Sequence, residues 1–128
     1  MSVAYLDTSA YVKTMVAEPE SKRLRAWLEQ WPERASCSLL RTEAVRALRR
    51  QGAGAVALAR AGFPTLELIR LDEELLDAAA DLDLELRSLD AIHVAAALSL
   101  GADLGALVTY DERMISAAQQ LHLPVVSP

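Results

Sequence analysis

The 128-residue sequence contains one cysteine, few aromatic residues (5 %) and no apolar run near the ~20 residues that cross a bilayer. One cysteine allows neither an internal disulfide nor a cysteine metal knuckle, so we expect Cys37 to be a small buried core residue. Its first residues have no basic flank and no long apolar stretch, which argues against a signal peptide. These absences predict a cytoplasmic protein without membrane association, whose core is packed by Ala, Leu and Val.

An excess of positive charge is also missing. The chain has 18 acidic and 13 basic residues, which disfavours a nucleic-acid partner because such partners prefer basic patches. A carboxylate cluster around a divalent cation would account for part of the negative charge. Eleven of the 13 basic residues are arginines, whose planar fork suits phosphate oxygens. Arg41, Arg46, Arg49 and Arg50 lie close together, either as phosphate contacts or as a solvated helix face.

Short apolar segments alternate with helical segments along the whole chain. The patterns predict strands at 2–6, 34–38, 64–72, 105–111 and 123–127, and helices at 9–19, 19–31, 38–52, 53–62, 72–86, 88–101 and 111–121. This alternation is typical of parallel strands joined by helical crossovers. We therefore expect one α/β domain over residues 1–128, with helices on both faces of the sheet.

Four carboxylates occupy unusual positions in this pattern. Asp7 ends the first apolar run, and Asp111 lies at the carboxyl end of the strand at 105–111. Each is also a suitable helix N-cap, so this simpler interpretation stays open. Asp90 lies near the start of a helix that is apolar on nearly every side, with Ser88 as its expected N-cap. Glu43 falls at the edge of an apolar helical stripe and is half turned toward the core.

Carboxylates gathered at close range repel one another, and a divalent cation relieves that repulsion. Mg²⁺ prefers hard oxygen ligands and needs only one or two direct carboxylates, since water fills its other positions. Such a site activates a water nucleophile and stabilises charge at a phosphoryl centre. The open edge of a parallel sheet, at the carboxyl ends of its strands, is where ligands bind.

The segments YLDTSAYVK, SLLRTEAVRAL, LRSLDAIHVAAAL and LVTYDERMISAA together resemble the acidic motifs of PIN-domain ribonucleases. Their order and spacing most closely resemble VapC, the toxin of bacterial VapBC toxin–antitoxin pairs. The resemblance implies a three-layer α/β/α sandwich around about five parallel strands. It implies metal-dependent endonucleolytic cleavage of RNA, with Asp7, Glu43, Asp90 and Asp111 around Mg²⁺ or Mn²⁺. It also implies a VapB-type antitoxin as partner and a homodimer.

Two further positions support the resemblance or depart from it. Ser9 matches the small hydroxyl that follows the first aspartate and is expected to hold Asp7 in place. Some relatives carry a fifth acid where this chain has Thr109, which could at most orient a water. His93, one turn after Asp90, is expected to be a packing or hydrogen-bonding residue, and His122 has no predicted role.

Our mechanistic hypothesis gives Asp7 and Asp90 the direct metal contacts. Asp111 and Glu43 then act through water or orient the attacking water. The main alternative is a catalytically inactive PIN-like module that binds RNA or a protein partner. A phosphoacceptor receiver domain needs paired acids near the first strand and a late lysine, and a two-aspartate phosphatase needs an acid at position 9. The chain has neither pattern.

Overall fold

The computed structural model describes residues 2–128 and places a parallel sheet at the centre of the fold. The five strands of the described part are β1 (Val3–Leu6), β2 (Arg34–Cys37), β3 (Glu67–Ile69), β4 (Leu104–Val108) and β5 (Val125–Val126). Every neighbouring pair is parallel, and the strand order is β3-β2-β1-β4-β5. The predicted α/β fold with about five parallel strands is confirmed. The predicted domain also includes Met1, which lies outside the described residues.

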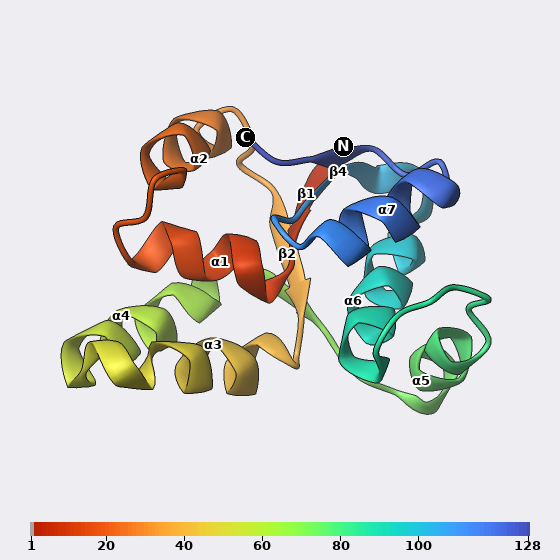
Figure 1. The fold of residues 1–128 in the computed structure, drawn as a ribbon, viewed down its shortest axis with the longest axis horizontal. Helices are drawn as coiled ribbons and strands as arrows, with labels where there is room; N and C mark the ends of the chain where they lie inside the picture. Colours follow the sequence, from red (N-terminus) through yellow and green to blue (C-terminus); the bar gives the residue numbers. More distant parts are fainter. Residues whose placement is uncertain (1) are drawn as a thin grey trace.

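Helices cover both faces of this sheet (Figure 1). On one side lie α1 (Thr8–Met15), α2 (Ser21–Leu28), α3 (Leu40–Leu48) and α4 (Ala53–Gly62); on the other lie α5 (Glu73–Ala80), α6 (Ser88–Ser99) and α7 (Glu112–Gln120). Short 3₁₀ turns occupy Arg49–Gln51, Phe63–Thr65 and Gly101–Asp103. The three-layer sandwich is thus confirmed. Within residues 2–128, no helix combines the length and the apolar character that crossing a bilayer requires.

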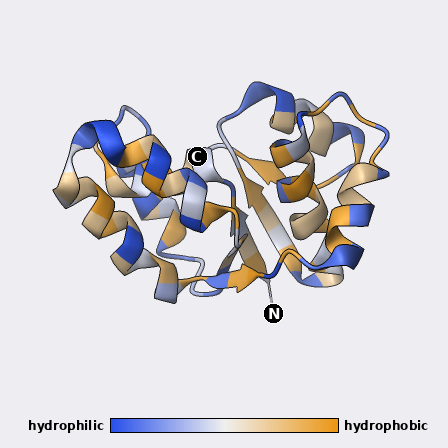
Figure 2. Ribbon diagram, turned by 90° about the horizontal axis from the view of Figure 1, so that it is seen from below, coloured by the Kyte–Doolittle hydropathy of each residue, from blue (hydrophilic) through white to orange (hydrophobic). Residues whose placement is uncertain are grey.

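Two separate apolar layers arise because neighbouring strand residues face opposite sides. In β1, Tyr5 packs with α5–α7, whereas Ala4 and Leu6 pack with α1 and α2. Because both faces of a central parallel strand are buried, its sequence is a nearly continuous apolar run rather than an alternation of apolar and polar residues. Figure 2 shows the same distribution, with apolar residues in the central strands and polar residues on the outer helices. Cys37 is fully buried in this core, as predicted.

Three sequence expectations about helix ends are wrong. The helix expected over 72–86 ends at Ala80, because Leu82, Leu84 and Leu86 alternate with exposed acids in a non-helical segment. Helix α1 ends at Met15, well before Pro19, because Val16 is already extended. Ser88 is the first residue of α6 rather than its N-cap.

The strand order determines where functional side chains can gather. The chain adds β2 and β3 on one side of β1 and then returns to add β4 and β5 on the other. The carboxyl ends of β1 and β4 therefore flank the point where the connections reverse direction, which is the usual ligand position in open α/β sheets. Asp7 and Asp111 follow these two strands.

Candidate active site

Asp7 is a buried carboxylate at the end of β1, with only 3 % of its surface exposed. Its Oδ1 accepts hydrogen bonds from Ser9 Oγ (2.7 Å) and from the backbone N–H of Ala10 (3.0 Å). Its Oδ2 accepts from Thr109 Oγ1 at 2.5 Å. Burial raises the pKa of Asp7, and these three hydrogen bonds only partly offset that rise. Asp7 is therefore both the N-cap of α1 and a buried carboxylate whose ionised form is disfavoured by burial.

Ser9 and Thr109 join the start of α1 to the end of β4. The hydroxyl of Thr109 also accepts from the N–H of Asp111 at 3.1 Å, and that of Ser9 accepts from the N–H of Tyr110 at 3.0 Å. Ser9 lies where we expected it, against Asp7. Thr109 was expected to orient a water at most; in the structure its side chain is fully buried and its hydroxyl donates to Asp7.

Asp111 and Asp90 lie at the starts of two helices. Asp111 caps α7, with Oδ1 accepting from the N–H of Met114 at 2.9 Å. Asp90 is in the first turn of α6. Burial raises the pKa of Asp90, and the nearby negative charges of Asp111 and Glu43 add to that rise. Arg87 approaches Asp90 only to 4.0 Å and is largely exposed, so it neutralises little of this charge.

Glu43, on α3, reaches the same edge of the sheet from the other helical layer. Its Oε1 accepts from Thr8 Oγ1 at 2.7 Å, and Thr8 is the residue after Asp7. The same oxygen lies 2.7 Å from Nε2 of His93, on α6. Burial alone would raise the pKa of Glu43, but the bonds from His93 and Thr8 outweigh it and lower that pKa.

The four predicted acids are therefore brought together from four different elements. Asp7 and Asp111 share Thr109 as a partner, Glu43 contacts the residue beside Asp7, and Asp90 lies within the electrostatic reach of Asp111 and Glu43. Across residues 2–128, no three His, Cys, Asp or Glu side chains are arranged so that they could hold a metal ion together.

Two side chains of this site were missed from the sequence. The sequence analysis gives Thr8 no role, and it expects His93 to pack or hydrogen-bond without any link to the acids. The hydrogen-bonding interpretation of His93 is confirmed. The available signal was its place in an apolar helix, because a buried polar ring needs polar partners.

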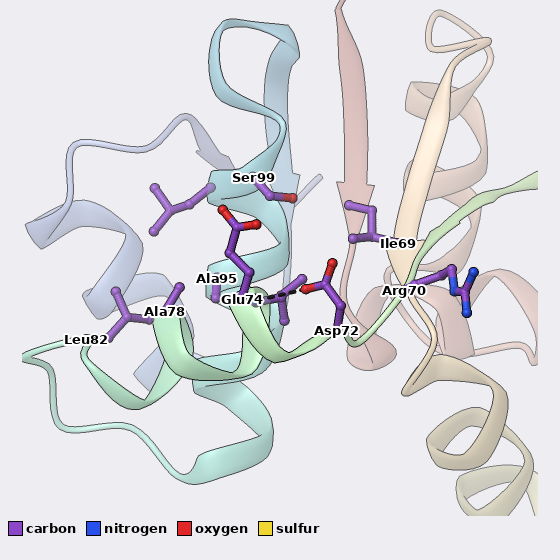
Figure 3. A pocket seen from close by; sticks show the side chains of 10 residues that line it. Ile69, Arg70, Asp72, Glu74, Ala78, Leu82, Ala95 and Ser99 are labelled. Carbon is purple, nitrogen blue, oxygen red and sulfur yellow. Dashed lines mark hydrogen bonds between the residues drawn. The ribbon is translucent and has the colours of Figure 1, made fainter.

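A separate cavity of about 500 Å³ lies between β3, α5 and α6 (Figure 3). Its lining is mainly aliphatic and contains none of the four predicted acids. The carboxylate of Asp72 is already used, since it caps α5 by accepting from the N–H of Leu75 at 2.9 Å.

Comparison with known proteins agrees with this geometry. The family model described as "PIN domain" matches residues 4–120. The chain belongs to the PIN-domain family. Within that family it is of the VapC type, since it is 47 % identical to Ribonuclease VapC46 of Mycobacterium tuberculosis, covering 100 % of this chain and 99 % of the relative. The family predicted from the acidic motifs is confirmed.

Two solved structures share the PIN fold of this chain. One is VapC20 of Mycobacterium tuberculosis, described as a sarcin–ricin loop cleaving toxin, with a TM-score of 0.76, 18 % identity and coverage of 98 % of this chain and 99 % of that one. The other is a toxin–antitoxin complex from Klebsiella pneumoniae, with a TM-score of 0.75, 21 % identity and coverage of 98 % and 97 %. At these identities the likeness shows the fold.

Proposed function

We propose that this chain is the toxin of a type II toxin–antitoxin pair, a metal-dependent endoribonuclease whose active site contains Asp7, Glu43, Asp90 and Asp111. Its membership of the VapC ribonucleases confirms the prediction of an RNA-cleaving hydrolase. The observation that carries the assignment of residues is the gathering of four carboxylates from β1, α3, α6 and β4–α7 at one edge of the sheet.

The donor chemistry of this site fits a divalent cation. The available ligands are carboxylate oxygens, which Mg²⁺ and Mn²⁺ prefer. Burial and the negative charges of Asp111 and Glu43 disfavour the ionised form of Asp90, and Arg87 hardly offsets this. A cation beside Asp90 would relieve this repulsion. Because Mg²⁺ keeps several waters, Asp7 and Asp90 are sufficient as direct ligands.

When bound, the cation lowers the pKa of a coordinated water and offsets charge on the scissile phosphate. The chain's own residues fix the surroundings of that reaction. Ser9 and Thr109 hold Asp7 in one orientation, because each of its oxygens accepts a hydroxyl hydrogen bond. Glu43 is kept ionised and orients the attacking water, and Asp111 adds negative charge beside Asp90.

The proposed partners follow from the same site. RNA is the substrate, and the exposed arginines of α3 and the turn after it, Arg46, Arg49 and Arg50, contact its backbone. VapC toxins pair with antitoxins, and the Klebsiella neighbour was solved as such a complex. We propose a VapB-type antitoxin that covers the acidic site, a homodimeric toxin, and action in the cytoplasm.

The test is cleavage of total RNA by the purified toxin, freed of antitoxin. We expect EDTA to stop cleavage and an excess of Mg²⁺ or Mn²⁺ to restore it. Addition of Ca²⁺ at the same concentration controls for a general effect of ionic charge. Cleavage that survives EDTA would contradict the metal mechanism. Binding of RNA without cleavage under any of these cations would favour the inactive PIN-like module instead.

A further inference from the structure

His93 is a buried ring with both nitrogens committed to polar partners. Only 2 % of its surface is exposed, in the middle of the apolar helix α6. Its Nδ1 lies 2.8 Å from Tyr5 Oη and 3.7 Å from Cys37 Sγ. Its Nε2 lies 2.7 Å from Glu43 Oε1 and 3.3 Å from Thr8 Oγ1. A ring held from both ends in a packed core cannot reorient without losing buried hydrogen bonds.

The contact between His93 and Glu43 joins the two helical layers at the site. Helix α6 packs on one face of the sheet, and α3 belongs to the layer on the other face (Figure 1). Tyr5 and Cys37 satisfy only Nδ1 of His93, so the buried Nε2 needs a polar partner of its own. Nε2 reaches a half-buried carboxylate of the predicted active site.

The proton in this contact belongs to the ring. Nε2 must carry the hydrogen when Glu43 is ionised, because a carboxylate can only accept, and this holds for neutral and charged imidazole alike. Thr8 donates to the same oxygen, Oε1. No donor among residues 2–128 binds Oε2 of Glu43. Two donors therefore fix one carboxylate oxygen and leave the other available for a water.

We infer that His93 is a positioning residue that holds Glu43 in the orientation it needs to align the attacking water. This inference rests on the proposed ribonuclease function and deepens it. The directions of the pKa shifts of His93 and Glu43 agree with a hydrogen bond between them. Burial lowers the pKa of His93, but the contacts with Cys37 and Glu43 outweigh burial and raise it, while the pKa of Glu43 falls.

Two amide substitutions at His93 separate positioning from packing. In His93→Gln the amide nitrogen can occupy the place of Nε2 and still donate to Glu43. In His93→Asn the amide reaches only the Nδ1 side, toward Tyr5 and Cys37, so the contact with Glu43 is lost. Both variants are polar and smaller than histidine, so both should lower the midpoint of urea unfolding by similar amounts.

We expect kcat for RNA cleavage to be at least about tenfold lower for His93→Asn than for His93→Gln, since misplaced catalytic groups cost up to about 10²-fold. KM should change little in either variant. In a Glu43→Ala background the two substitutions should give equal kcat, because the side chain at position 93 then has no acceptor at position 43 to hold. Equal kcat for the two variants in the native background, or an equal ratio in both backgrounds, would overturn the inference.

A measurement without metal or RNA examines the contact itself. The chain has two histidines, so the ¹H–¹⁵N side-chain spectrum is simple, and His122→Asn assigns them. We expect Nε2 of His93 to be protonated in the metal-free protein and its signal to shift in Glu43→Gln. An Nε2 without a proton would overturn the inference. If this spectrum is as expected but the wild-type protein cleaves no RNA, the proposed function fails instead, and the positioning role in cleavage fails with it.

Discussion

Substitution of Thr109 by valine examines a buried hydrogen bond of the site, the one from Thr109 to Asp7. Valine has almost the same shape as threonine but cannot donate to Asp7 Oδ2 or accept from the N–H of Asp111. Loss of a hydrogen bond to a charged group costs about 1.5–3 kcal/mol, and an unpaired buried N–H adds about 1 kcal/mol or more. We therefore expect Thr109→Val to lower the free energy of unfolding by about 2–4 kcal/mol at neutral pH.

The cost should depend on pH in a defined direction. Burial already raises the pKa of Asp7, and loss of the Thr109 donor raises it further. A carboxyl whose folded pKa is raised loses stability as pH rises from its ordinary value of 3.8 through the folded value. The penalty of Thr109→Val should thus be largest at neutral pH and should shrink as the pH falls through the folded pKa of Asp7 toward its ordinary value of 3.8.

Urea unfolding at several pH values measures this, with Thr109→Ser as the matched control. Serine keeps the hydroxyl and removes one buried methyl group, which costs about 1 kcal/mol at every pH. Equal losses for valine and serine, or a valine penalty that does not change with pH, would refute the reasoning.

Three further predictions concern stability. Asp7→Asn should raise the free energy of unfolding at neutral pH and give no gain below about pH 4, as pH-dependent denaturation would show, because it removes a buried charge whose pKa is raised. His122→Gly should raise the free energy of unfolding in urea by about 1 kcal/mol, because His122 has a left-handed φ of 57°. Gly101 has a left-handed φ of 55°, so Gly101→Ala should lower the free energy of unfolding by a similar amount. Gly105→Ala should lower the melting temperature, because its Cβ would lie 2.6 Å from the Trp31 ring, and overpacking costs about 1–3 kcal/mol; an unchanged melting temperature would contradict this contact.

The position of the acids was largely predictable from the sequence. Asp7 and Asp111 each follow a short apolar run, and the carboxyl ends of parallel strands share one edge of the sheet. A carboxylate in a helix that is apolar on nearly every side indicated a special role for Asp90. Glu43 was indicated by its position at the edge of the apolar stripe of its helix. These signals are local; the strand order brings Asp7 and Asp111 together, and the packing of α3 and α6 on the sheet adds Glu43 and Asp90.

The partners of the acids were not predictable in the same way. The bond from Thr109 to Asp7 joins residues 102 positions apart, and that from His93 to Glu43 joins residues 50 positions apart. Such contacts depend on the register of β1 against β4 and on how α6 packs, which periodicity does not encode. The helix predicted after Ala80 is absent because apolar residues at every second position are typical of extended backbone, not of a helix.

The central claim is that Asp7 and Asp90 act together in one metal-dependent centre that cleaves RNA. Single-turnover cleavage of a defined RNA in Mg²⁺ by Asp7→Asn and Asp90→Asn tests it most directly, with Asp77→Asn on the exposed side of α5 as the matched control. We expect both site variants to stay folded and to lose at least about 10²-fold in rate, while Asp77→Asn keeps the wild-type rate. Wild-type rates for Asp7→Asn and Asp90→Asn would contradict the claim.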